Sequence, residues 1–136
     1  MTHIIMVSHG EYAKAMIESA ELIVGEQENI TAFGFNLGDS VDQLQESIAN
    51  ELKRVQRNSD RDVLVLTDMF SGSPFNAVTS LMQEYSFHHI TGINLPLMLE
   101  VLMSRDESSV EELCKSVLEK GKDTIVYVNK FLEEME

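Results

Sequence analysis

The chain has 136 residues, of which 43% are hydrophobic and 24% charged, which suits one globular domain with a sizeable core. Ten basic residues stand against 23 acidic ones, giving a formal net charge of −13, and this balance argues against nucleic acid as a partner because phosphate backbones bind to positive surfaces. With one cysteine, no basic and apolar leader, and no run of the roughly 20 apolar residues that a membrane helix needs, we expect a cytoplasmic protein.

The first element is an apolar run that stops at Ser8-His9-Gly10. A short apolar run bounded in this way predicts a buried strand, with His9 at its carboxyl end. Apolar residues then recur with helical spacing over Tyr12 to Val24, and Gly25 is a typical residue to follow a helix. A second strand is predicted over Ile30 to Phe35.

The middle of the chain repeats this alternation. Ser40 and Gln43 have the spacing of a capping box, and they predict the start of a second helix whose apolar stripe reaches Val55. A polar turn over Gln56 to Arg61 follows. The third strand, Asp62 to Thr67, has a continuously apolar core, which is typical of a central parallel strand covered on both faces.

The third helix is predicted to begin at Ser73, because Ser73 and Pro74 are typical N-cap and first-turn residues. A fourth strand is predicted over about His89 to Ile93. His88 and His89 are expected at or before its amino end, away from the edge of the sheet at which His9 lies.

The last third of the chain begins with a helix that starts at Asn94-Leu95-Pro96. It is apolar on nearly every side over Leu97 to Met103, as in a helix that is buried all round or covered by a second subunit. Ser108-Ser109, with glutamates three residues later, predicts the last long helix, which ends at Gly121. The β-branched run Thr124 to Val128 predicts a final strand before a short acidic tail.

This alternation of strands and helices predicts the fold class. Right-handed crossovers turn it into a doubly wound α/β domain, with a mainly parallel sheet and helices on both faces. We expect a single domain over residues 1–136.

Two strand ends carry side chains that suit one another. His9 closes the first strand and Asp68 follows the third, and in doubly wound sheets these strands are commonly neighbours whose carboxyl ends face one crevice. A carboxylate there can hold one imidazole nitrogen as N–H, which leaves the lone pair of the other nitrogen free to act as a nucleophile or base.

The loop Ser71-Gly72-Ser73 opens the third helix, and a helix amino terminus favours an anion, phosphate above all. Taken singly, Asp68 and Ser73 also fit plain capping and turn roles. The chain lacks a GxxxxGK[ST] loop, so a nucleotide-dependent kinase is not expected, and neither is a metal or cofactor.

Four segments in order carry a resemblance to a known family. They are Val7-Ser8-His9-Gly10, Gly25-Glu26-Gln27-Glu28-Asn29, Gly72-Ser73-Pro74-Phe75-Asn76 and Gly92-Ile93-Asn94-Leu95-Pro96-Leu97. With them the chain resembles the enzyme IIA component of the mannose/fructose/sorbose family of the bacterial phosphoenolpyruvate-dependent sugar phosphotransferase system.

The resemblance implies a catalytic histidine and its partners. His9 would take a phosphoryl group from the histidine-containing phosphocarrier protein and pass it to a IIB component, and Asp68 would orient the imidazole. The membrane components IIC and IID would take part indirectly, and the last strand would be exchanged in a homodimer. The phosphate- and partner-binding residues would be Gly10, Phe70, Ser71, Gly72 and Ser73.

Two residues depart from the family pattern. Ser71 stands where many members have glycine, and Phe70 stands where many have tryptophan, which keeps an aromatic docking surface of a different size.

The sequence fits several other functions less well. A response-regulator receiver needs an acidic pair after the first strand, and a histidine phosphatase has an arginine before its histidine, where this chain has Ser8. Two closer alternatives stay open: the phosphocarrier subunit of dihydroxyacetone kinase, and a regulatory IIA-like domain of a transcription activator.

Overall fold

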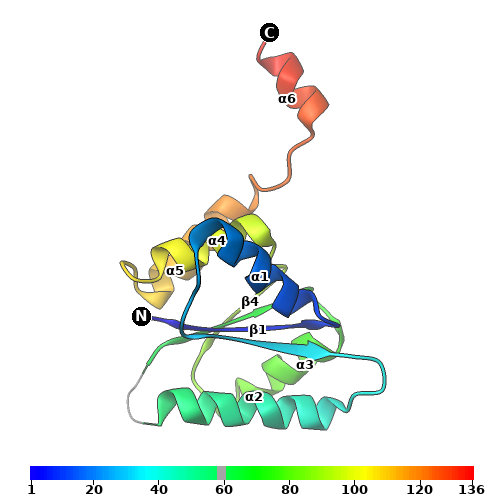
Figure 1. Cartoon of the computed structure of the whole chain (residues 1–136), viewed down its shortest axis with the longest axis vertical. Helices are drawn as coiled ribbons and strands as arrows, with labels where there is room; N and C mark the ends of the chain where they lie inside the picture. Colours follow the sequence, from blue (N-terminus) through cyan, green and yellow to red (C-terminus); the bar gives the residue numbers. More distant parts are fainter. Residues whose placement is uncertain (58–60) are drawn as a thin grey trace.

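The computed structural model describes residues 1–57 and 61–136 and is built around one parallel sheet (Figure 1). Its four strands are β1 (His3–His9), β2 (Ile30–Phe35), β3 (Val63–Thr67) and β4 (His88–Thr91), in the spatial order β2-β1-β3-β4. As in other parallel sheets, strands buried on both faces are almost continuously apolar. The order places β1 beside β3, so the predicted neighbours are confirmed.

Helices cover both faces of this sheet, and the predicted doubly wound α/β architecture is confirmed. Alternate residues of β1 point to opposite faces, so Ile4 packs with one layer of helices and Ile5 with the other. The first layer consists of α1 (Tyr12–Val24), α4 (Leu95–Ser104) and α5 (Val110–Gly121), and the second of α2 (Val41–Gln56) and α3 (Gly72–Leu81).

Side-chain caps fix several of the helix starts, as the sequence indicated. The hydroxyl of Ser40 accepts the N–H of Gln43 at the start of α2, and Asn94 caps α4. Ser109 and Glu112 form a complete capping box at α5. Because each cap satisfies N–H groups that have no partner within the helix, these boundaries were readable from sequence.

Two predicted boundaries are wrong. The N-cap residue of α3 is Ser71 rather than Ser73, because Ser71 is extended and the chain turns into the helix at Gly72, whose φ of +89° lies outside the helical range. Strand β4 spans His88–Thr91 rather than His89 to Ile93, so both histidines lie in the strand. Of the predicted polar turn over 56–61, residues 58–60 lie outside the described residues.

The predicted last strand is absent from this single chain. In the described part of the chain, residues 124–127 pair with no other strand, and α6 (Val128–Glu134) takes the place of the expected acidic tail. A strand needs a neighbour for its backbone hydrogen bonds, and this segment leaves the body of the molecule before α6 (Figure 1). Helix α4 likewise keeps Met103 exposed, so it is not buried all round.

Candidate active site

The carboxyl edge of the sheet brings together the two residues that the sequence singled out. His9 is the last residue of β1, and Asp68 directly follows β3. Because β1 and β3 are hydrogen-bonded neighbours running in parallel, their carboxyl ends lie side by side.

One carboxylate oxygen of Asp68 accepts two hydrogen bonds from His9. Its Oδ2 atom lies 2.9 Å from the backbone nitrogen of His9 and 2.8 Å from the ring atom Nδ1. The other oxygen, Oδ1, accepts the N–H of Met69 at 3.1 Å. With Nδ1 donating its proton to the carboxylate, the lone pair of Nε2 is left available. The His9 side chain is 46% exposed and that of Asp68 only 12%, so the carboxylate is the sheltered partner.

The start of α3 lies against the free nitrogen of His9. A Cβ atom added to Gly72 would be 2.9 Å from Nε2 and 3.0 Å from Cε1 of His9, distances that no side chain tolerates without displacing the ring. Glycine is therefore required at position 72 for two reasons. A side chain there would collide with the His9 ring, and its φ of +89° is one that other residues rarely adopt. The amino terminus of α3 thus lies directly beside Nε2.

Changing Gly72 to alanine should lower the rate of any reaction at Nε2 by roughly 10²-fold, because small misplacements of reacting groups cost about that much. The matched control is Gly92→Ala, which carries the same backbone strain at φ +85° but has no atom within 4 Å of the added Cβ. Phosphorylation rates of the two folded variants check this expectation. Equal rates would show that the contact with His9 is unimportant.

The remaining predicted site residues lie around this centre. The backbone N–H of Gly10 donates to Phe35 O at 2.8 Å, which fixes the turn that leaves His9. Ser71 is exposed in extended conformation, without a hydrogen bond from its side chain to the helix, and Ser73 is half-buried in the first turn. The structure thus brings all the predicted residues to one edge, while their roles stay predictions.

An aromatic pair beside the site includes a residue that the sequence analysis did not single out. The exposed ring of Phe70 packs against Phe75 with centroids 5.0 Å apart, and Phe75 packs against His89 at 5.3 Å. His89 Nε2 lies 2.9 Å from the hydroxyl of Thr67, and burial lowers the pKa of His89 to about 4. His89 is therefore neutral at physiological pH, and its ring packs against Phe75 from strand β4. Phe75 could have been found as an apolar residue in the first turn of α3.

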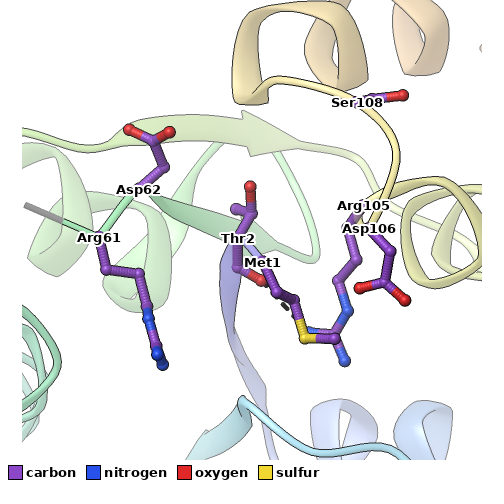
Figure 2. A pocket seen from close by; sticks show the side chains of 7 residues that line it. All are labelled: Met1, Thr2, Arg61, Asp62, Arg105, Asp106 and Ser108. Atoms are coloured by element: carbon purple, nitrogen blue, oxygen red, sulfur yellow. Dashed lines mark hydrogen bonds between the residues drawn. The ribbon is translucent and has the colours of Figure 1, made fainter.

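A cavity lies at the opposite edge of the sheet (Figure 2). It measures about 370 Å³ and borders Thr2, before β1, and Asp62, before β3. Arg105 lines it but is buried, and its guanidinium donates to Thr2 O, Glu28 O and Asn29 O and to the side chain of Gln27. Arg105 thus anchors the loop that contains the Gly25–Asn29 segment, and it is separate from His9.

The described residues contain neither a metal-binding cluster nor a membrane-spanning helix. Among residues 1–57 and 61–136 there is no group of three histidine, cysteine or acidic side chains that could hold a metal ion. Within the same ranges, no helix is both long and apolar enough to cross a membrane.

Comparison with known proteins supplies the family. The model of the family described as "PTS system fructose IIA component" matches residues 3–118. The chain belongs to this family. The IIA chain is 31% identical to the "PTS system fructose-specific EIIA component" of Bacillus subtilis (strain 168) over 136 residues, covering 99% of the chain and 92% of that relative.

Two further comparisons agree. The IIA chain is 32% identical over 124 residues to the "PTS system mannose-specific EIIAB component" of Escherichia coli (strain K12), covering 90% of the chain but 38% of that longer relative. The crystal structure of the phosphotransferase system component EIIA from Streptococcus agalactiae superposes with a TM-score of 0.84 at 30% identity, covering 96% of this chain and 99% of that one. The chain is therefore a phosphotransferase-system IIA component of the mannose/fructose/sorbose family.

Proposed function

We propose that the chain is a single IIA phosphotransfer domain in which His9 carries the phosphoryl group. The histidine-containing phosphocarrier protein would donate it and a IIB component would accept it, during coupled uptake and phosphorylation of a sugar. The observation that carries this proposal is the pair of hydrogen bonds from His9 to Asp68 Oδ2, since they leave Nε2 as the open nitrogen.

The transfer exchanges one phosphorus–nitrogen bond for another. The lone pair of Nε2 attacks the phosphorus atom, the bond to the donor's histidine breaks, and the donor ring keeps the electron pair. Nδ1 keeps its proton throughout, and the Asp68 carboxylate compensates the positive charge that develops on the His9 ring. The reverse sequence delivers the group to IIB. No metal or cofactor is needed, because phosphoryl transfer rests mainly on positioning and electrostatics.

The start of α3 is suited to the negative charge of the phosphoryl group. The first N–H groups of a helix have no partner inside it, and the helix dipole favours an anion at this end. Gly72 brings this helix end to Nε2, and the Ser73 hydroxyl lies in the same turn. Stabilisation of the transferring group is the role that we assign to Gly10, Ser71, Gly72 and Ser73.

Partner proteins would dock over the exposed ring of Phe70, which lies two residues after Asp68 and is 77% exposed. IIC and IID would take part only through IIB. We also propose a homodimer in which residues 124–127, before α6, pair with the free edge of β4 in the other subunit. Support comes from the β-branched sequence, from the open edge of β4, and from a cavity of about 360 Å³ beside that edge, bordered by Ile90 and Leu97.

Incubation with phosphoenolpyruvate, enzyme I and the phosphocarrier protein tests the proposed phosphorylation. The chain should gain one acid-labile phosphoryl group, read by intact-mass spectrometry, and should lose it when a cognate IIB protein is added. Absence of phosphorylation would overturn the proposal. A phosphorylated chain that passes the group to no IIB protein would instead favour the regulatory alternative, and transfer to a dihydroxyacetone kinase would favour the other.

A further inference from the structure

The last helix has an apolar face that its own chain leaves uncovered. Apolar side chains recur over α6 and its C-cap residue with the spacing i, i+3, i+4 and i+7, and their exposed fractions range from 51% to 70%. They are Val128, Phe131, Leu132 and Met135. Every residue from 125 to 136 is exposed, and α6 stands away from the body of the molecule (Figure 1).

A helix of this kind does not persist in water by itself. Helices shorter than roughly 12–15 residues are marginal without tertiary packing, and α6 has only seven residues. Neither end of α6 is held by a side-chain cap. The helix therefore needs a surface that covers its apolar face.

The segment before α6, residues 124–127, is called the tether, and its position indicates where that surface lies. Thr124 is held at the carboxyl end of β4, where its hydroxyl accepts a hydrogen bond of 2.9 Å from the side chain of Asn94. In a strand-exchanged dimer, each exchanged segment occupies the place that the partner's own segment would fill. The exchanged segment must then run from the carboxyl end of the partner's β4 back to its amino end, antiparallel to that strand.

The length of the tether agrees with the length of the strand. Thr124 to Val128 spans about 13 Å when extended, and the four residues of β4 span about 10 Å. A segment paired along β4 therefore delivers α6 to the amino end of that strand, beside Phe87 and His88.

A groove of about 290 Å³ lies at this place. Phe87 and Val63 supply apolar surface in it, while Arg61 and Asp62 supply one charge of each sign. The charged residues of α6, Lys130 and the pair Glu133-Glu134, lie outside its apolar face. The apolar face of α6 can therefore cover Phe87 and Val63 while its charged side chains stay in solvent.

We propose that α6 packs its apolar face against the amino end of β4 in a second copy of this chain, over the groove at Phe87. This inference rests on the strand exchange proposed above and adds a second contact to it. Each dimer would contain two such contacts, related by the two-fold axis.

Site-specific disulfide formation tests the contact directly. In a Cys114→Ser background, one tagged chain carries Leu132→Cys and a differently tagged, co-expressed chain carries Ser86→Cys, a change at an exposed position of the groove. Mild oxidation should link the two differently tagged chains. The control partner carries Leu22→Cys, which is 90% exposed on α1, and it should form no link. Linking with Leu22→Cys to the same extent, or no linking with Ser86→Cys, would overturn the proposal.

Dimer dissociation separates this contact from the strand exchange. Phe131→Ser combined with Leu132→Ser should raise the dissociation constant about tenfold or more, measured by sedimentation, because two apolar side chains lose their cover. The polar-face control Lys130→Gln should change it less. An unchanged constant would overturn α6 docking and leave the exchange standing, whereas a monomeric parent chain would overturn both. Phosphorylation should persist in every variant, so these outcomes are distinct from a failure of the phosphotransfer function.

Discussion

Replacement of His9 by alanine should reduce phosphorylation of the IIA chain to background. Its Nε2 atom is the nucleophile in the proposed transfer, and alanine offers no atom that can form the bond to phosphorus. Intact-mass spectrometry after incubation with phosphoenolpyruvate, enzyme I and the phosphocarrier protein measures the effect. Continued labelling of this variant would refute the assignment of His9.

The variant should fold, so loss of labelling can be attributed to chemistry. The His9 side chain is 46% exposed at the end of β1, outside both clusters of buried apolar residues. The matched control is His88→Gln, which changes a histidine at the amino end of β4, at the opposite edge of the sheet. Labelling of this control should match that of the parent chain.

Changing Asp68 to asparagine should slow transfer in both directions by up to roughly 10⁴-fold, the loss seen when an aspartate that orients a catalytic histidine is replaced in this way. With its oxygen in the place of Oδ2, asparagine can still accept both hydrogen bonds from His9, but its NH₂ group then faces the N–H of Met69. In the opposite orientation the NH₂ group faces Nδ1 and favours the tautomer with its proton on Nε2, and in either orientation the negative charge beside the phosphorylated ring is lost.

Rapid-quench kinetics with the phosphocarrier protein and with IIB measure this effect. The control Asp62→Asn removes the same charge at the amino end of β3 instead of the carboxyl end, so it separates tautomer selection from net charge. Transfer rates of Asp68→Asn equal to those of the control would show that the carboxylate is dispensable.

Elements with strong local signals could be predicted from the sequence. The bounds of β2 and α1 agree with the prediction, because each has a clear apolar period and a glycine or polar segment at its end. The start of α3 was misplaced because the chain turns into the helix at Gly72, and the serine and proline that follow give no sign of this turn. The final strand could not form within one chain, since strand formation requires a partner that local sequence does not supply.

In the candidate site, too, some contacts could be predicted from the sequence and others could not. Contact between His9 and Asp68 follows from topology, because a parallel order of strands places their carboxyl ends together. The second hydrogen bond, from the His9 backbone to the same oxygen, and the close approach of Gly72 depend on the detailed conformation of the loops. Likewise, the support of Phe70 by Phe75 and His89 depends on the register between β3 and β4.

The fixed orientation of the His9 ring also bears on the order of events. Because Asp68 holds Nδ1, the proposed donor and acceptor would both have to reach Nε2 from the same side of the imidazole. The two proteins would then compete for the same surface without forming a ternary complex, and we expect ping-pong kinetics. An excess of unphosphorylated acceptor would act as a competitive inhibitor of charging. The flux through the chain would accordingly depend on the ratio of the two partners as well as on their amounts.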